Sequence, residues 1–534
     1  MSEFHYQAIL PKPSAGKGAL FRKLGPDGIA MRRCGDRRLL EVSASALEQL
    51  AYEAFRDMAF FFPSHVLEQW AAIARDADAG QNERFVAGTL LANAIISAQE
   101  VLPACQDTGV AEIIGFRGRD VLTTCDEAAA LSRGAFNAYN RHNLRQSLVA
   151  ATDMFNEANT GDNMPAQVEI FTDDSAACNF VFIAKGGGSS NKTSLSQESK
   201  AVLEGPALES LLRERLSRIG VAACPPYHVG IAIGGTSPEQ ALKTAKLASL
   251  GLYDSLPRTG DGRGGAFRCP QWEEKVLEIM QSLGLGAQFG GRHMATDARV
   301  IRLPRHSASC SVAISVSCSA HRVICGRIDA DGVWLEELDR QPERFADLAA
   351  DAGAAGAAEI RLDVPMGEII TQLSSCRAGD RIRLSGPLVV ARDIAHQRIK
   401  AEFDRTCKLP DYFRNHPVYY AGPAKTPPTM ASGSLGPTTA QRMDPYMETF
   451  MANGACLVTL GKGNRHPSVS ESCRRHKGYF LGTIGGAAAI LAKNHVLSSE
   501  IIDYPELGME AVRLITVRDL PAFVIIDAEG NSIY

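Results

Sequence analysis

The feature that most constrains the fold of this chain is a change of sequence pattern between residues 326 and 360. The composition there becomes acidic and rich in alanine and glycine, and its least structured stretch, DLAADAGAAGAAE, is typical of a linker. At 534 residues the chain is also longer than one typical domain. The sequence therefore predicts an N-terminal domain at 1–338, a linker at 339–358 and a smaller C-terminal domain at 359–534.

Hydrophobic periodicity indicates both helices and strands, with helices predominating before the linker. Apolar residues at helical spacing predict helices at 45–62, 64–76 and 126–150, and the first of these opens at Ser45 with the spelling of a capping box. Two short strands, AQVEIF and NFVFIAK, follow. Beyond the linker, strand-like segments such as RIRLSGPLVV, VRLITV and AFVIID alternate with helical ones. The predicted fold class is mixed α/β, with a helix-rich N-terminal domain and a smaller α/β C-terminal domain.

Charge and hydropathy exclude some classes of partner. A net charge of −4 gives the chain no general attraction to nucleic acid or to an anionic bilayer. The longest mostly apolar run, 479–492, is short for a membrane span and is interrupted by glycines. The first residues lack the pattern of a secretory signal, so we expect a cytoplasmic protein, with an organelle matrix not excluded. The 13 cysteines then indicate reduced thiols or metal ligands rather than disulfides.

A glycine-rich loop, KGGGSSNKT at 185–193, nearly spells a phosphate-binding loop. Asn191 stands where that loop needs its second glycine, which disfavours a nucleotide site. The ordinary alternative is a tight turn whose glycines adopt positive φ. A third alternative is that exposed amides of the loop bind a carboxylate.

A second glycine-containing loop, GSLGPTTAQRMD, ends at residue 444. Pro437 is typical of a first helical turn, so the segment predicts a helix whose N-terminus faces an anion. In such a helix Thr438 and Arg442 stand at i and i+4 on one face, where they predict an activated hydroxyl or a carboxylate clamp. An ordinary helix cap with a surface arginine is the alternative.

Three cysteines lie in loop-like surroundings that are rich in proline or small polar residues: Cys105 in LPACQDTG, Cys224 in AACPPYHVG and Cys318 in SVSCSAHR. Their wide separation gives no CxxC signal, and a single buried cysteine is more often a small apolar residue than a ligand. Cys325 and Cys456, within apolar runs, are typical of core residues.

Ten segments together resemble class I fumarate hydratase, the iron–sulfur type. They are LPACQDTG, IAKGGGSSNKT, AACPPYHVGIAIGGTS, LGLGAQFGG, VIRLPRHSASC, VSCSA, VARDIAH, YYAGPAKTP, ASGSLGPTTAQRMD and YPELGMEA, in one order over nearly the whole chain. The resemblance implies an N-terminal domain that holds the cluster ligands and a C-terminal domain that closes over the substrate. The related tartrate dehydratases divide these parts between subunits, so the fusion favours fumarate hydratase.

The resemblance also implies the roles of individual residues. Cys105, Cys224 and Cys318 would hold a four-iron, four-sulfur (4Fe-4S) cluster with one iron left open, which suits Lewis-acid chemistry rather than electron transfer. Thr438 would act as the base and Asp107 as the acid in the reversible hydration of fumarate to malate. The remaining implied residues contact or orient the substrate: Gln106, Arg145, Gly188, His306, Arg392, Arg442 and Lys462. Without the resemblance, the cations among them would be read as surface residues.

Other functions are considered beside this one. A nucleotide-dependent enzyme would rest on the loop at 185–193, and an iron–sulfur regulator would need a basic surface that the composition does not indicate. Within the enzyme class, the alternative substrates are tartrate and the methyl-substituted pair methylmalate and mesaconate, which differ from malate and fumarate by one hydroxyl or methyl. The resemblance further implies a homodimer with no nucleic-acid or membrane partner.

Overall fold

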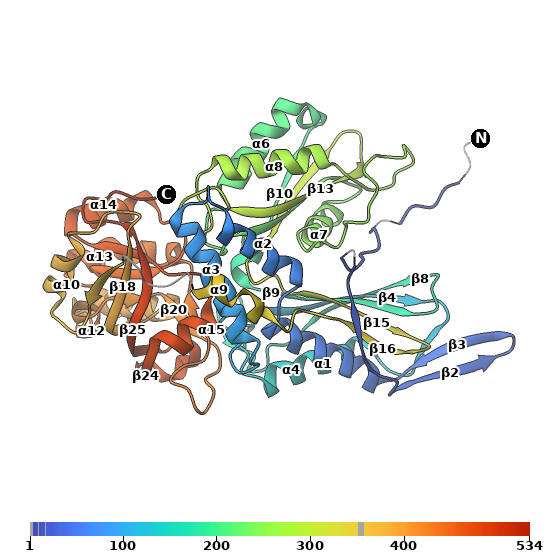
Figure 1. Cartoon of the computed structure of the whole chain (residues 1–534), viewed down its shortest axis with the longest axis horizontal. Helices are drawn as coiled ribbons and strands as arrows, with labels where there is room; N and C mark the ends of the chain where they lie inside the picture. The colour runs from blue at the N-terminus through green and yellow to red at the C-terminus, as the bar shows by residue number, and fades with distance from the viewer. Residues whose placement is uncertain (1–3, 9, 17, 351–356) are drawn as a thin grey trace.

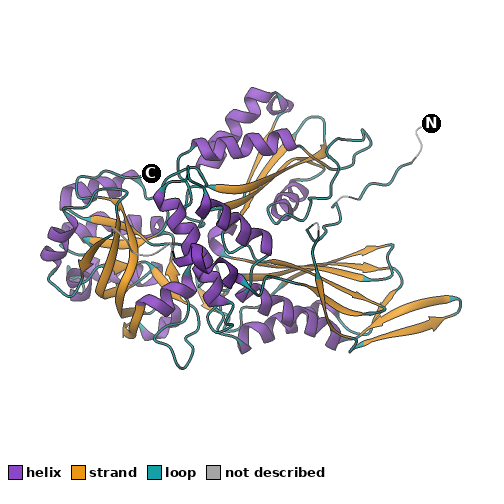
Figure 2. Cartoon of the chain, viewed as in Figure 1, coloured by secondary structure: helices purple, strands orange, loops and turns teal. Residues whose placement is uncertain are grey.

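The structure is a computed structural model that describes residues 4–8, 10–16, 18–350 and 357–534. Its elements confirm the predicted mixed α/β fold class. Three large sheets lie in different parts of the molecule, with helices packed between and around them (Figures 1 and 2). Part of the predicted linker, 351–356, lies outside the described residues.

The first sheet has six strands in the order β1-β16-β15-β9-β4-β8. Its strands are β1 (Phe21–Gly25), β4 (Val110–Gly118), β8 (Gln167–Asp173), β9 (Cys178–Lys185), β15 (Val323–Asp329) and β16 (Gly332–Glu336). Helices α1 (Ala44–Phe60) and α4 (Glu127–Arg141) pack on one face, where Leu47, Leu50 and Phe55 share a core with the sheet. The segments AQVEIF and NFVFIAK thus form β8 and β9, as predicted.

The predicted start of α1 is wrong by one residue, and its capping box is absent. The helix begins at Ala44 after Ser43, so Ser45 lies inside the first turn. The hydroxyl groups of Ser43 and Ser45 lie 2.8 Å apart, within hydrogen-bonding distance, and the Ser43 side chain caps no helix amide.

The helix predicted at 126–150 is shorter in the structure, where α4 ends at Arg141. The side-chain oxygen of buried Asn163 accepts hydrogen bonds from the amides of Ser147 and Leu148, at 2.8 and 3.0 Å. These two amides therefore do not donate to the carbonyls of a helix. The chain continues as the hairpin of β6 (Val149–Ala151) and β7 (Glu157–Asn159).

The second sheet has five strands in the order β10-β14-β11-β13-β12. Its strands are β10 (Ser194–Glu198), β11 (Tyr227–Gly235), β12 (Phe267–Arg268), β13 (Ala295–Arg305) and β14 (Cys310–Ser317). Helices α6 (Gly205–Ser217) and α8 (Pro270–Ser282) share one core with it (Figure 1). Helix α7 (Pro238–Ala248) shares another core with residues of both the first and second sheets.

The third sheet has seven strands in the order β17-β18-β19-β22-β23-β25-β24. Its strands are β17 (Ala358–Arg361), β18 (Arg381–Val390), β19 (Val418–Tyr419), β22 (Val458–Gly461), β23 (Tyr479–Gly482), β24 (Val496–Asp503) and β25 (Val512–Ile526). The two predicted strands VRLITV and AFVIID form the single strand β25. The accompanying helices are α10 (Met366–Leu373), α11 (Asp393–Thr406), α12 (Asp411–Asn415), α13 (Asp444–Ala452) and α14 (Pro467–His476).

Helix α3 (Gln81–Ser97) lies in the middle of the molecule and joins its parts (Figure 1). Phe85 of α3 meets Phe523 of β25 edge to face, with ring centroids 5.9 Å apart. Asn93 is fully buried and donates to the carbonyl oxygens of Ala104 and Gly486, while its own oxygen accepts from the amide of Ala489. One buried amide therefore positions the loop before Cys105 against the C-terminal third of the chain.

The remaining elements complete the chain. They are α2 (Ser64–Arg75), β2 (Ile29–Cys34), β3 (Arg37–Val42), β5 (Val121–Thr123), α5 (Gly187–Ser190), η1 (Lys200–Leu203), η2 (Pro342–Phe345), α9 (Ala346–Ala350), β20 (Ala421–Pro423), β21 (Leu435–Pro437), η3 (Ala440–Met443), α15 (Ala488–Ile490), the π-helical turn Leu491–His495 and η5 (Pro505–Glu510). Within the described ranges, no helix combines the length and apolar character needed to cross a bilayer.

The close approach of α7 to β11 depends on Gly230. A Cβ at this position would lie 2.1 Å from the carbonyl oxygen of Ala245 and 2.3 Å from the amide of Ser249. Because both neighbours are backbone, we expect Gly230→Ala to lower the free energy of unfolding by about 3 kcal/mol or more. A Cβ at Gly205 meets nothing within 4 Å, so Gly205→Ala serves as the control. Urea denaturation of both variants checks this, and equal midpoints would contradict the packing described.

Candidate active site

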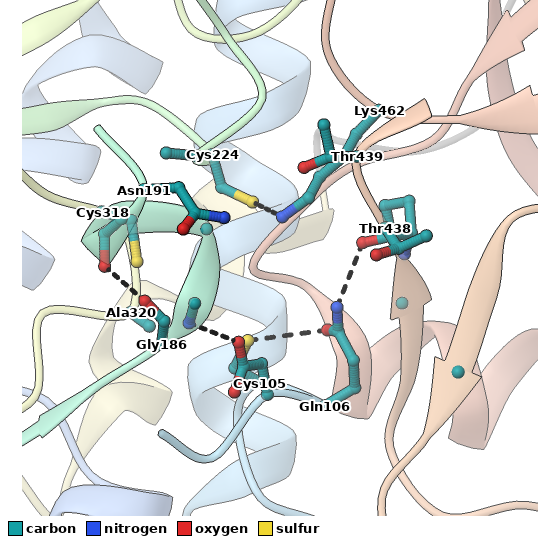
Figure 3. A pocket seen from close by; sticks show the side chains of 18 of the residues that line it. Cys105, Gln106, Gly186, Asn191, Cys224, Cys318, Ala320, Thr438, Thr439 and Lys462 are labelled. Carbon is teal, nitrogen blue, oxygen red and sulfur yellow. Dashed lines mark hydrogen bonds between the residues drawn. The ribbon is translucent and has the colours of Figure 1, made fainter. Parts of the chain in front are cut away.

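A cavity of about 660 Å³ is lined by residues between Cys105 and Arg322 and by residues between Arg392 and Glu510. Its lining includes all the site residues predicted from the sequence except His306: Cys105, Gln106, Asp107, Arg145, Gly188, Cys224, Cys318, Arg392, Thr438, Arg442 and Lys462. Figure 3 shows the three cysteines around one side of the cavity and Thr438 on the other side. Segments that are far apart in the sequence thus converge on one space.

His306 lies outside this cavity. It follows the last residue of β13 in an exposed loop, and its Nδ1 accepts a hydrogen bond from the amide of Ala308 at 3.1 Å. Within one chain, the structure gives this imidazole no contact with the other predicted site residues among the described residues.

The loop that carries Cys105 is fixed by backbone hydrogen bonds. The amide of Ala104 donates to the carbonyl of Ala59 at the end of α1, at 2.9 Å. Gly109 ends the loop with φ +84°, and a Cβ there would lie 2.7 Å from the backbone of Ala184. A glycine is therefore required for the loop to pass close to the end of β9.

The loops of Cys224 and Cys318 are bonded directly to each other. The amide of Ser319 donates to the carbonyl oxygen of Cys224 at 3.0 Å. Cys224 itself has φ +64°, and Lys462 Nζ donates to its sulfur at 2.8 Å (Figure 3). Burial raises the pKa of Cys224, an effect that nearby Lys462 partly opposes.

The three thiols fit a ligand larger than one ion. They lie close enough to interact electrostatically, since the negative charges of Cys105 and Cys318 both act to raise the pKa of Cys224. In the described part of the chain, no three His, Cys, Asp or Glu side chains converge on one metal-ion position. Iron–sulfur clusters, by contrast, take each thiolate on a separate iron. The Ser319 hydroxyl is buried there and has no hydrogen-bond partner among the described residues, which also fits a bound polar group.

Two glycines keep backbone close to these thiols. A Cβ at Gly485 would lie 2.2 Å from the sulfur of Cys224, and a Cβ at Gly486 would lie 2.3 Å from the Ser319 hydroxyl. Any side chain at either position would enter the space beside the cysteines. The donor set and the space around it therefore fit a 4Fe-4S cluster held by three thiolates.

The glycine-rich loop at 185–193 holds a carboxylate of the protein itself. The amide of Gly187 donates to Asp107 Oδ2 at 2.9 Å, and a Cβ on Gly186 would lie 3.0 Å from the same oxygen. Gly186, Gly187 and Gly188 all have negative φ, so the predicted turn with positive φ is wrong. The structure shows one amide of the loop, that of Gly187, bonded to a carboxylate of the protein itself, Asp107.

Asp107 is held in its ionised form. Burial acts to raise its pKa, but the positive charges of Arg145 and Arg322 and the amides of Gly187 and Gly109 outweigh that effect and lower the pKa. The cavity thus has a half-buried, ionised carboxylate beside the cysteines at neutral pH.

The backbone around Thr438 differs from the prediction. Pro437 does not begin a helix but ends β21, which pairs with β20. The amides of Thr438 and Ala440 donate to the carbonyls of Tyr420 and Lys462, at 2.7 and 2.9 Å. These long-range bonds keep the segment extended, and the helical turn starts later, with η3.

The predicted contact between Thr438 and Arg442 is confirmed despite this change. Arg442 Nη2 donates to Thr438 Oγ1, and Arg442 Nη1 lies 3.0 Å from a carboxylate oxygen of Asp393. Gln106 Nε2 donates to the carbonyl of Pro437 at 3.1 Å, which ties the Cys105 loop to the threonine. The Thr438 hydroxyl therefore faces the cavity beside a guanidinium.

Positive charge is concentrated in this cavity although the chain is acidic overall. Arg392 is only 4% exposed, and burial together with repulsion from Arg145 and Arg442 lowers its pKa to about 10. Burial also lowers the pKa of Lys462, but the Cys224 thiolate more than compensates, so the net pKa is raised. The cavity is thus built to attract a small anion.

The sequence reasoning missed several cavity residues, chiefly Asn191, Arg322 and Glu510. Arg322 is buried and its Nε donates to the carbonyl of Ala184, so it crosses from the Cys318 loop to the end of β9. Its place four residues after Cys318 was the available signal. Glu510 lies in the recognised segment YPELGMEA, but no charge pattern in that segment indicates a cavity residue.

Comparison with known proteins agrees with this geometry. The family described as Fumarate hydratase (Fumerase) matches residues 48–326, and the family described as Fumarase C-terminus matches residues 332–534. Fumarate hydratase 2 of Leishmania major is 49% identical over 499 residues, which cover 93% of this chain and 88% of that protein. The aerobic class I fumarate hydratase of Escherichia coli strain K12 is 46% identical, with 99% and 97% covered.

A third relative matches a shorter part of the chain. The L(+)-tartrate dehydratase subunit beta of E. coli strain K12 is 32% identical over 165 residues, which cover 30% of this chain and 80% of that subunit. Both family matches and the full-length relatives agree over nearly the whole sequence. The chain therefore belongs to the class I fumarate hydratase family of hydro-lyases.

Proposed function

We propose that the chain catalyses the reversible hydration of fumarate to (S)-malate with a 4Fe-4S cluster held by Cys105, Cys224 and Cys318. The observation that carries this proposal is the single cavity in which three cysteines face a hydroxyl–guanidinium pair and several further cations. When bound, the cluster supplies a Lewis-acid iron without a protein ligand, which withdraws electron density from a substrate oxygen.

The cations of the cavity bind and orient the substrate dianion. Arg145, Arg392, Arg442 and Lys462 line the same space, together with Gln106 and the backbone at Gly188. Guanidinium groups pair with carboxylates through two parallel hydrogen bonds, so they fix direction as well as charge. A four-carbon dicarboxylate is thereby held with its central carbons between Thr438 and the cysteines.

Thr438 is the group that moves the carbon-bound proton. A threonine hydroxyl is a weak base, and its conjugate alkoxide needs a neighbouring positive charge. Arg442 donates a hydrogen bond to this oxygen, which supports the role. In the dehydration direction Thr438 removes the proton from malate, and in the hydration direction it returns the proton.

Asp107 moves the oxygen-bound proton. Its lowered pKa makes the carboxylate the resting form, so it can accept a proton from the attacking water during hydration. In the reverse direction the protonated Asp107 donates to the departing hydroxyl group. Gly187 and Gly109 hold the carboxylate in place through their amides.

The assembly and domain division belong to the same proposal. We infer an N-terminal domain at 1–338 that holds the cluster, a linker at 339–358 and a C-terminal domain at 359–534 that closes the cavity. We also infer that the protein is a homodimer and that it lies in the cytoplasm or an organelle matrix. The oligomeric state and the location are both inferred from the family to which the chain belongs.

The experiment that tests this function begins with anaerobic reconstitution of the protein with iron and sulfide. Malate is then added, and the formation of fumarate is measured by its absorbance. We expect the enzyme to convert malate to fumarate and fumarate to malate. Tartrate and mesaconate are assayed in parallel as alternative substrates. A brown, reconstituted protein that converts tartrate and ignores malate would overturn the substrate assignment. The partial likeness to a tartrate dehydratase subunit makes this comparison necessary.

A further inference from the structure

One cation of the cavity already has a carboxylate partner within the chain. Arg392 Nη2 donates to Glu510 Oε1, and both residues line the cavity. Arg392 is buried, whereas the Glu510 side chain is 24% exposed. A guanidinium that we assign to the substrate is therefore paired with the protein's own carboxylate.

The surroundings make this position a carboxylate site. A Cβ on Gly422 of β20 would lie 2.8 Å from Arg392 Nη1, so the guanidinium packs against backbone on one side. Arg145 and Arg442 are close enough to lower the pKa of Arg392 by repulsion. Glu510 thus pairs with one guanidinium beside two others, of which Arg442 is also paired with Asp393.

The segment that carries Glu510 is held by few buried contacts. None of the residues of η5 is buried, and the segment contains a non-helical residue, Gly508, at φ 59° and ψ −108°. Tyr504, just before it, has a left-handed φ of 49°, which is uncommon for a bulky residue. Glu510 Oε2 is buried without a hydrogen-bond partner among the described residues. Such a segment can open locally at low cost.

We propose that Glu510 is an internal substitute for a substrate carboxylate: it pairs with Arg392 in the empty site and gives way when a dicarboxylate enters. This inference rests on the proposed function of the cavity. Glu510 then lowers the affinity for the substrate, because a ligand must compete with it for Arg392. The apparent affinity equals the intrinsic affinity multiplied by the fraction of molecules in which Arg392 is free. If Glu510 instead held Arg392 in place for the substrate, removing its charge would weaken the binding of a dicarboxylate rather than tighten it.

The test uses succinate, a dicarboxylate with neither a double bond nor a hydroxyl group to react. Isothermal titration of the reconstituted holoenzyme with succinate measures the dissociation constant for wild type, Glu510→Gln and Glu506→Gln. Glu506 lies on the same turn and pairs with exposed Arg398, outside the cavity, so it controls for the loss of one negative charge. We expect Glu510→Gln to bind succinate about tenfold more tightly than wild type, or about 1.4 kcal/mol, and Glu506→Gln to match wild type within about twofold.

Weaker or unchanged succinate binding by Glu510→Gln overturns the inference, and so does a wild type that binds no succinate. If Glu510→Gln does not fold, as judged by thermal unfolding, Glu510→Asp replaces it. That variant withdraws the carboxylate by one methylene and is expected to tighten binding by a smaller factor; weaker or unchanged binding there overturns the inference as well. Because succinate is not converted, a wild type that binds succinate but fails to hydrate fumarate would overturn the proposed function and leave this inference standing.

Discussion

Replacing Cys318 by serine is expected to abolish turnover and to leave the protein without its full complement of iron and sulfide. A serine oxygen is a poor ligand for cluster iron, and the two remaining thiols would hold the cluster weakly. Loss of Lewis-acid assistance removes several kcal/mol of transition-state stabilisation, so the expected drop is about 10³-fold or more. Iron and sulfide analysis after anaerobic reconstitution, together with the fumarate assay, measures both effects.

The control for this variant is Cys269→Ser. Cys269 has a similar intermediate exposure, lies outside the cavity and precedes α8 as its N-cap, where serine is favoured. We expect this variant to keep its iron, sulfide and activity. If Cys318→Ser retained both the cluster and the rate, the three-cysteine site would be wrong.

Replacing Thr438 by alanine is expected to slow the chemical step without weakening substrate binding. Loss of a general base typically costs about 10²–10⁴-fold in rate, and we expect a fall of that size in kcat. The arginines and Lys462 that bind the dianion are unchanged, so KM should stay within about threefold of wild type. Steady-state kinetics of malate dehydration on the reconstituted enzyme gives both constants.

Two neighbouring variants sharpen the Thr438 experiment. Thr439 lines the same cavity one residue along (Figure 3), so Thr439→Ala controls for loss of a nearby hydroxyl and should change kcat by less than about tenfold. Thr438→Ser keeps the hydroxyl beside Arg442 and should restore much of the rate. Equal losses in kcat and in affinity for Thr438→Ala would instead make this residue a substrate clamp.

Local sequence patterns predicted much of the fold. The apolar spacing of α1 and the strand pattern of β9 both appear in the structure close to their predicted positions. The errors arose where distant polar groups capture backbone amides. Asn163 binds two amides within the range 126–150, where a longer helix was predicted, and the carbonyls of Tyr420 and Lys462 hold the chain around Thr438 extended. Such contacts leave no periodic signal in the sequence.

The sequence predicted which residues form much of the site, but it did not predict how they are arranged. The resemblance to the family named the cysteines and cations that line the cavity, and only His306 lies elsewhere. Arg322 and Glu510 enter through tertiary packing, from a loop and a short turn that carry no motif of their own. The use of the glycine-rich loop to hold Asp107 also required the fold, because the carboxylate comes from a loop 80 residues away.

The measurement that most directly tests the central claim is Mössbauer spectroscopy of the protein reconstituted anaerobically with iron-57. Three thiolates on a four-iron cluster predict that one iron of the four is distinct, and that the addition of malate or fumarate changes the signal of this iron alone. Four equivalent irons that do not respond to substrate, or no cluster at all in carefully prepared protein, would contradict the account.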